Sequence, residues 1–171
     1  WALGAPVNTH ANLEEAQKTG ISYPVQAAEK FARICAPNYM ETQTGSYIYP
    51  FRFIFMSFWG AEENQFRSLW VWGDTRRIKG AAEKGLFEAM DASEVVDGKK
   101  CLDVISFRVG GVLAKGDAVT SMITTGTVPS ITVDRLAAKA IHKCVVGDVD
   151  NRRVLENAEI LGEDWAMGNS I

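Results

Sequence analysis

The stretch that decides the fold is FRFIFMS (51–57), followed after a loop by GDTRRIKGAAE (73–83). A short apolar run rich in aromatic residues is typical of a buried strand rather than of a helix of the same length. Asp74 is a residue type that favours the N-cap of a helix. We therefore predict a buried strand, a loop, and a helix that carries Lys79 in its second turn. Open α/β sheets place their chemistry at the carboxyl ends of strands, which makes Ser57 and Lys79 the first candidates for a site.

The totals are those of an ordinary soluble globular protein with one domain over residues 1–171. A net charge of −3 and a pI of about 5.4 give no electrostatic footprint for nucleic acid or anionic lipid. The longest apolar run is far shorter than the roughly 20 residues that span a bilayer, so no membrane partner is expected. Three scattered cysteines, Cys35, Cys101 and Cys144, and no signal-like start indicate a reducing, cytoplasmic location.

The remaining segments alternate between strand and helix patterns, which predicts an α/β fold with a mainly parallel sheet. Pro24 lies inside one helical pattern, so we expect a kink or break near Tyr23. The chain opens on what reads as the end of a strand, so we expect that its beginning is missing. Besides the central strand and helix, we predict strands over 1–3, 101–107, 130–133 and 153–157, the last followed by a frayed tail. We predict helices over 13–35 and over 134–146, the second capped by Asp134. Loops are expected from Pro37 to Tyr49 and over 114–129, and a turn with paired glycines over 108–112.

Taken in this order, five segments resemble the C-terminal two thirds of a short-chain dehydrogenase/reductase of the atypical or extended type. More closely, they are similar to small fungal NAD(P)-binding Rossmann proteins described as epimerase-like. The resemblance implies a Rossmann-like parallel sheet with flanking helices that lacks the N-terminal, glycine-rich βαβ portion. The segments that carry it are ALG (2–4), the strand that ends at Ser57, GDTRRIKG (73–80) with EKG (83–85), RVGGV (108–112) and ITVDRLA (131–137).

The resemblance also implies roles for individual residues. Lys79 corresponds to the lysine that holds the nicotinamide ribose and lowers the pKa of a catalytic tyrosine. Ser57 corresponds to the serine that orients the substrate carbonyl, and Thr75 occupies the place of the tyrosine itself. The segments expected along the dinucleotide are Leu3, Gly4 and Ala5 in the first loop, and Arg108, Val109, Gly110, Gly111 and Val112 after a later strand.

Two departures from the family pattern limit the implied function. The hydroxyl of Thr75 titrates far above any useful pH and cannot replace a phenol as proton donor. The chain also has no glycine-rich strand-to-helix turn to bind the pyrophosphate. NAD(P) is therefore expected as cofactor only if a missing N-terminal portion supplies that turn.

The leading hypothesis is an NAD(P)-binding oxidoreductase-like protein that acts on a small carbonyl or alcohol substrate. The alternatives are a non-catalytic, dinucleotide-responsive scaffold or interaction protein, and an inactive fragment. Oligomerisation is possible through the helix over 74–93, whose small residues favour close packing.

Three further groups of residues each have a functional and a structural interpretation. Arg76 and Arg77 either meet the 2′-phosphate of NADP or lie on a solvated helix face, and the second is favoured. The aromatic residues between strand and helix either form a substrate wall or partner surface, or close a core edge. His10 and His142 have no companion at metal-ligand spacing, so no metal site is expected. The aromatic residues are Phe58, Trp59, Phe66, Trp70 and Trp72.

Overall fold

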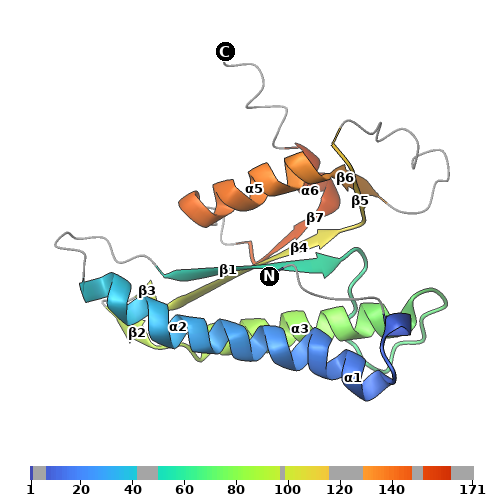
Figure 1. Cartoon of the computed structure of the whole chain (residues 1–171), viewed down its shortest axis with the longest axis horizontal. Helices are drawn as coiled ribbons and strands as arrows, with labels where there is room; N and C mark the ends of the chain where they lie inside the picture. Colours follow the sequence, from blue (N-terminus) through green and yellow to red (C-terminus); the bar gives the residue numbers. More distant parts are fainter. Residues whose placement is uncertain (2–6, 42–49, 97–98, 116–128, 148–151, 163–171) are drawn as a thin grey trace, which may run out of the picture.

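The central feature of the protein is a parallel sheet of three strands in the order β1-β4-β7 (Figure 1). It comprises β1 (Phe51–Phe58), β4 (Leu102–Val109) and β7 (Val154–Glu156). The computed structural model describes residues 1, 7–41, 50–96, 99–115, 129–147 and 152–162. The prediction of an α/β fold with a mainly parallel sheet is confirmed for this part of the chain.

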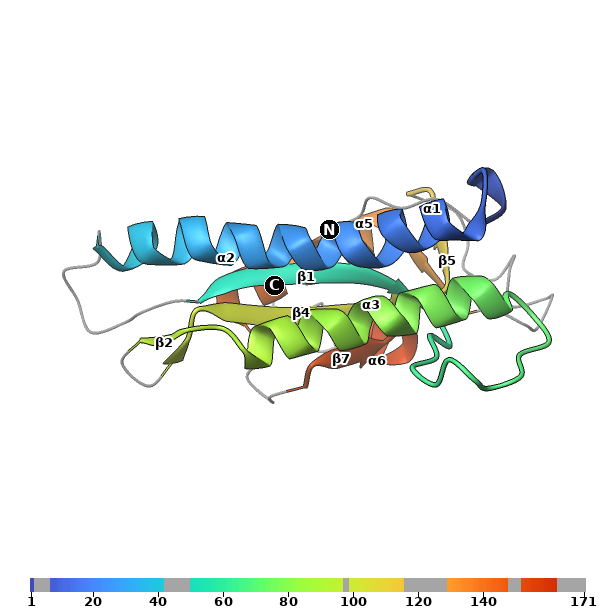
Figure 2. The same cartoon turned by 90° about the horizontal axis from the view of Figure 1, so that it is seen from below.

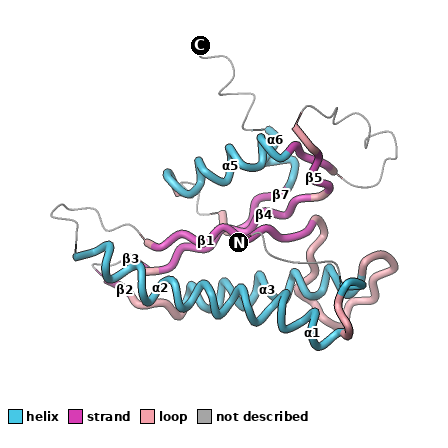
Figure 3. The backbone as a smooth tube through the Cα atoms, in the orientation of Figure 1, coloured by secondary structure: helices cyan, strands magenta, loops and turns pink. Residues whose placement is uncertain are grey.

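Helices cover both faces of the sheet (Figures 1 and 3). One face packs on α2 (Tyr23–Glu41) and α3 (Gly73–Asp91), and the other on α5 (Val133–Val146) and α6 (Asn157–Gly162). Successive strand residues point to opposite faces, so Phe53 and Phe55 join the first core while Ile54 joins the second. The alternation explains why β1 and β4 are apolar almost throughout.

Trp1 continues the sheet beyond β1. The backbone N–H of Met56 donates to the carbonyl of Trp1 at 3.1 Å, and the Trp1 amino group donates to the carbonyl of Ile54. This pattern is that of parallel pairing, with Trp1 opposite Phe55. The predicted strand over 1–3 therefore has its first residue beside β1, and residues 2–6 lie outside the described part of the chain.

The N-terminal helical region contains an irregularity just before Pro24. The 3₁₀ turn η1 (Val7–Thr9) and helix α1 (Leu13–Gln17) lead into a π-helical turn, η2 (Lys18–Ser22), which α2 follows directly. Proline has no N–H and its ring clashes with the carbonyl four residues earlier, and the wider π turn avoids that clash. The predicted break near Tyr23 is thus a π turn, and the helix continues.

Helix α2 ends later than predicted, at Glu41 rather than near Cys35. The expectation that a loop begins at Pro37 was wrong for 37–41. A proline removes one intrahelical hydrogen bond and distorts the helix, but it does not always end it. The remainder of that predicted loop, 42–49, lies outside the described residues.

Both predicted N-cap aspartates lie inside their helices instead. Asp74 is the second residue of α3 and Asp134 the second of α5, while Trp72 and Thr132 occupy the N-cap positions. A carboxylate in the first turn is favoured by the helix dipole as well. An aspartate in the sequence therefore marks a helix start without fixing the cap.

Helices α2 and α3 lie side by side along the sheet (Figure 2). A Cβ atom on Gly85 would lie 3.0 Å from Cγ2 of Val25, so the two helices approach closely at that glycine. The small residues of α3 therefore pack against a helix of the same chain. Oligomerisation through this helix stays a prediction, but its small-residue stripe is already covered.

Four short strands and α6 complete the described elements. The antiparallel pair β2 (Val95–Val96) and β3 (Lys99–Lys100) was not predicted, and neither was α6. The strand β6 (Ser130–Thr132) pairs in parallel with β5 (Gly111–Leu113). The predicted strands over 130–133 and 153–157 and the helix over 134–146 are confirmed to within a few residues. None of the described helices has the length and apolar character that crossing a bilayer requires.

Candidate functional site

A row of polar side chains crosses the sheet where its three strands end. Ser57 of β1 is in register with Arg108 of β4, which is in register with Glu156 of β7. Residues in register on parallel strands share a face, and Ser57 shares its face with Phe53 and Phe55. The row therefore lies on the side of the sheet that α3 covers.

Helix α3 supplies a lysine to the end of β1. The Nζ atom of Lys79 donates a hydrogen bond of 2.9 Å to the carbonyl of Met56, the residue just before Ser57. The same Nζ lies 4.8 Å from the ring centroid of Phe55. Burial lowers the pKa of Lys79 below its ordinary value of 10.5, and the nearby Glu83 carboxylate opposes that shift. The amine is thus held at the same strand end as the Ser57 hydroxyl.

Ser57 is buried, and its Oγ has no hydrogen-bond partner among the described residues. A buried hydroxyl without a partner is unfavourable by about 1–3 kcal/mol. Such groups in folded proteins call for an explanation, and one explanation is a ligand atom that completes the bond. Ser57 is the unpartnered hydroxyl at the carboxyl end of β1.

Glu83, one turn after Lys79, anchors the middle of the row. Its side chain is 0% exposed. The carboxylate accepts hydrogen bonds from Arg108, the shortest from Nη2 at 2.6 Å, and from the Ser106 hydroxyl at 2.8 Å. Arg108 also donates to Glu156 at 3.2 Å. Hydrogen bonds to Glu83 are the main reason that the pKa of Arg108 is raised further above its ordinary value.

This ion-pair network was not predicted from the sequence. The spacing of Lys79 and Glu83 could have indicated part of it, because residues four apart on a helix lie on the same face. A carboxylate beside the buried stripe of α3 requires a cation, but the sequence offers many and does not say which. Arg108 was expected along a dinucleotide; its guanidinium is bound by carboxylates of the protein itself.

Thr75 lines a small pocket together with Lys79, one turn further along α3. Other lining residues come from η1, α1 and η2 and from the segment between η1 and α1, and they include His10 and Thr19. Thr75 and Lys79 therefore line this pocket together with residues of the N-terminal helical region. The structure brings Ser57 and Lys79 to one strand end, with Thr75 and Lys79 in one adjoining pocket.

The paired glycines after β4 do not form the predicted turn. Gly110 separates β4 from β5, and Gly111 begins β5. Among the described residues, the glycines with positive φ are Gly60 and Gly147, so neither of the pair needs glycine for its backbone conformation. The N–H of Gly110 donates to Oδ1 of the buried Asn157 at 3.2 Å.

The other residues expected along the dinucleotide have mixed placements. Val109 is buried in the second core, while Val112 is exposed on β5. Leu3, Gly4 and Ala5 lie outside the described residues. Among the described residues, no three His, Cys, Asp or Glu side chains gather as metal ligands would.

The loop over 59–72 is fixed to α3 by backbone contacts. Arg76 donates to the carbonyl of Gly60 at 2.6 Å, and Arg77 donates to the carbonyl of Arg67 at 2.9 Å. The sequence favoured a solvated helix face for Arg76 and Arg77. In the structure, both side chains bind backbone carbonyls of the loop instead. Their role in the described structure is to hold this loop.

The same loop presents aromatic residues to solvent. Phe66 and Trp70 are 97% and 98% exposed, so they do not close a core edge. Trp72 packs edge-on against Phe58, with ring centroids 5.6 Å apart. The five aromatic residues thus divide into a pair in contact, Phe58 and Trp72, two side chains that are almost fully exposed, and Trp59, which is 38% exposed.

No protein-family model matches this chain, and neither does any curated protein, so the chemistry of the site is argued from its own geometry.

Proposed function

We propose that this chain forms the substrate side of an NAD(P)-dependent oxidoreductase of the short-chain dehydrogenase/reductase type, which acts on a small carbonyl or alcohol. One observation carries the proposal. The Lys79 amine binds the β1 backbone immediately before Ser57, so the two side chains with the expected roles meet at one strand end. Ligands of open α/β sheets bind outside the carboxyl ends of the strands.

The sheet layout supports the same proposal. Strands β1 and β4 are parallel neighbours joined through α3, and Trp1 pairs in parallel on the free edge of β1. The carboxyl ends of β1 and β4 then lie at one edge of the sheet, and the chain at Trp1 runs in the same direction. This layout is like that of a Rossmann fold.

The side chains present fit the nicotinamide end of a dinucleotide. An ammonium group has three N–H donors, and Met56 is the acceptor that Lys79 uses within the described residues. Two donors therefore remain for ribose hydroxyls. The unpartnered Ser57 hydroxyl can donate to a substrate carbonyl oxygen. The pyrophosphate end has no such fit here, because these 171 residues contain no glycine-rich strand-to-helix turn.

When bound, NAD(P) would supply or accept the hydride. The chain's own part is to orient the carbonyl through Ser57 and to hold a proton nearby. Thr75 cannot hold that proton in a useful pH range, whereas Lys79 has a pKa lowered by burial. We assign the proton to Lys79 for this reason.

Dinucleotide binding tests the proposal directly. The complete gene product is titrated with NADPH and NADH, with nicotinamide fluorescence as the signal. Lys79→Met removes charge-assisted hydrogen bonds and is expected to weaken binding by about tenfold or more. Lys84→Met is the matched control, because Lys84 lies exposed on the same helix. Absence of binding below millimolar concentration for both dinucleotides would overturn the proposal.

A second candidate is a non-catalytic protein that binds a dinucleotide and signals its presence. Thr75 in place of the expected tyrosine favours it. Carbonyl reduction distinguishes the two candidates: turnover by the wild-type protein excludes the non-catalytic one. If only Thr75→Tyr gains turnover, the site is an oxidoreductase site that has lost its proton donor.

A further inference from the structure

Helix α3 is attached to the end of the sheet at two points that lie one helical turn apart. The Lys79 amine donates to the carbonyl of Met56 on β1 at 2.9 Å. One turn further along the helix, the Glu83 carboxylate accepts from the Ser106 hydroxyl at 2.8 Å and from Nη2 of Arg108 at 2.6 Å, both on β4. The proposed function uses the first attachment and leaves the second without a role.

The register between the two strands places these attachments side by side. Phe55 of β1 is in register with Ser106 of β4. The Lys79 amine lies 4.8 Å from the ring centroid of Phe55, and the Glu83 carboxylate is bound by the Ser106 hydroxyl. Adjacent strands are about 4.8 Å apart. The ammonium and the carboxylate therefore lie at the same level of two neighbouring strands, on the same face of the sheet.

The charge of Glu83 is in a place that water does not reach. Its side chain is 0% exposed. Opposite charges attract each other more strongly where water is excluded than at the protein surface. Lys79 is itself half-buried. Burial lowers the pKa of Lys79, and the Glu83 charge acts against that lowering, in agreement with the geometry.

Other ionisable groups surround the Lys79 amine in the described part of the chain. Burial lowers the pKa of the N-terminal amino group, and the charge of Lys79 lowers it further. None of these groups is altered when Glu83 alone is replaced, so a difference between Glu83 variants reports on Glu83. The groups are the Trp1 amino group, His10 in the adjoining pocket, Arg108 on β4, and the two further carboxylates that Arg108 faces, Glu63 and Glu156.

We propose that Glu83 is a positioning residue for Lys79. Paired with Arg108, it fixes α3 on β4 so that the amine meets the end of β1, and its charge helps the amine to keep its proton. Because its side chain is fully enclosed by the protein, Glu83 acts through Lys79 rather than on a ligand. Its importance for catalysis rests on the proposed function, whereas its effect on the amine does not.

The test observes the Lys79 amine itself, in the protein without dinucleotide. Lysine side chains are labelled with ¹⁵N, and the Nζ resonance of Lys79 is assigned by its loss in Lys79→Met. Glu83→Gln is expected to lower the pH at which the amine loses its proton, because the neighbouring opposite charge is removed. Ser106→Ala removes a hydrogen bond of Glu83 but keeps every charge, so it is expected to leave that pH unchanged.

Arg108→Met is expected to have the opposite effect to Glu83→Gln. A carboxylate stays ionised at the alkaline pH where a lysine titrates, and without Arg108 the charge of Glu83 acts on Lys79 with less offset. The amine then keeps its proton to higher pH, and the two variants are expected to differ by about one pH unit or more. Both substitutions destabilise the fold, so a merely structural role of Glu83 would give shifts of one sign or none.

Two results would overturn the proposal: an unchanged Lys79 titration in Glu83→Gln, or shifts of the same sign in Glu83→Gln and Arg108→Met. Where Arg108→Met does not fold, equal titrations of Glu83→Gln and Ser106→Ala would overturn it. Dinucleotide binding is measured separately. Opposite shifts in a protein that binds neither NADPH nor NADH would support the role of Glu83 at Lys79 and refute the oxidoreductase function.

Discussion

The carboxylate of Glu83 should contribute strongly to the stability of this fold. The substitution Glu83→Gln keeps nearly the same volume but removes the charge that faces Arg108 at 2.6 Å. Removing one partner of a buried ion pair destabilises proteins by about 3–5 kcal/mol. The low end applies here, because the Arg108 side chain is 19% exposed and keeps Glu156 as a partner.

We therefore expect Glu83→Gln to lower the free energy of unfolding by about 3 kcal/mol. For a chain of this size, that corresponds to a fall in Tm of about 6–12 °C. Urea denaturation followed by circular dichroism measures the first quantity and thermal melting the second. Glu88→Gln, exposed on the same helix, is the control and should change stability by less than about 0.5 kcal/mol.

A double-mutant cycle tests the assigned partner. Arg108→Met leaves the fully buried Glu83 carboxylate without its main cation, so it should destabilise more than Glu83→Gln does. In the Arg108→Met background, Glu83→Gln should therefore become less harmful or even favourable, with a coupling of about 2 kcal/mol or more. A loss below about 1 kcal/mol for Glu83→Gln, or additive effects in the cycle, would refute the reasoning.

Three further substitutions test other parts of the fold. Gly80→Ala should destabilise by about 2 kcal/mol or more in urea denaturation, because the added Cβ would lie 2.1 Å from the carbonyl oxygen of Glu62. Asp91→Asn should remove a pH dependence: hydrogen bonds from Arg153 and Lys100 lower the pKa of Asp91 from 3.8 to about 2, so wild-type stability relative to the variant holds above pH 3.8 and falls toward pH 2. Lys79→Met should remove a pH dependence of the same sign at alkaline pH: because burial lowers the pKa of Lys79 in the folded state, wild-type stability relative to the variant should rise as pH approaches 10.5.

Each of these has a control or a contrary outcome. Gly85→Ala meets only a side chain, Cγ2 of Val25 at 3.0 Å, and helix propensity favours alanine by about 1 kcal/mol, so it should be far milder than Gly80→Ala. Parallel pH profiles for the wild type and Asp91→Asn would contradict the assigned ion pairs. A stability difference between the wild type and Lys79→Met that stays flat from pH 8 to 10.5 would show that the amine is not buried in the folded state.

The sequence by itself determined that β1 and β4 are parallel neighbours, and it determined the candidate pair Ser57 and Lys79. A buried strand, a helix and a second buried strand in succession are enough to place Ser57 at a strand end and Lys79 above it, because a strand–helix–strand unit permits few arrangements. The buried face of α2 was predicted from the spacing of its apolar residues, and the strands near residues 130 and 154 from short runs of strand-forming residues. These are local patterns, and burial of apolar side chains enforces them.

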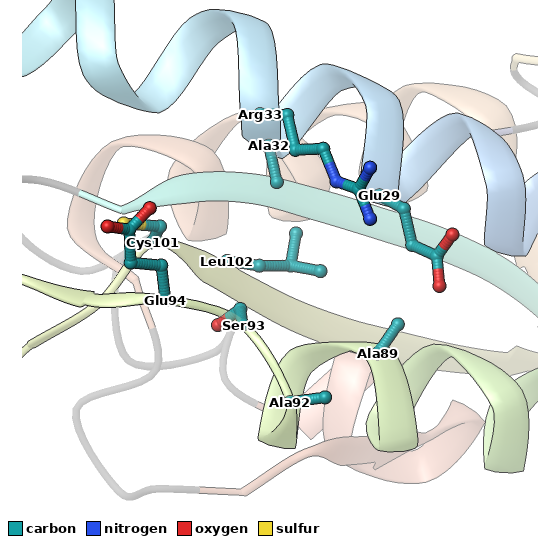
Figure 4. Close-up of a pocket in the computed structure, with 9 residues that line it drawn as sticks. All are labelled: Glu29, Ala32, Arg33, Ala89, Ala92, Ser93, Glu94, Cys101 and Leu102. Atoms are coloured by element: carbon teal, nitrogen blue, oxygen red, sulfur yellow. The ribbon is translucent and has the colours of Figure 1, made fainter.

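Only the tertiary structure decided which charges meet and where space remains. Glu83 and Arg108 are 25 residues apart, and their pairing depends on the register between helix and sheet as well as on side-chain rotamers. The backbone of Glu62, in the loop that carries the exposed Phe66 and Trp70, lies against Gly80 of α3. Space remains between α2, the end of α3 and the start of β4, where Ala32, Ala89 and Leu102 line a pocket (Figure 4). Contacts of this kind are fixed by the packing of distant segments, which no pattern within one segment specifies.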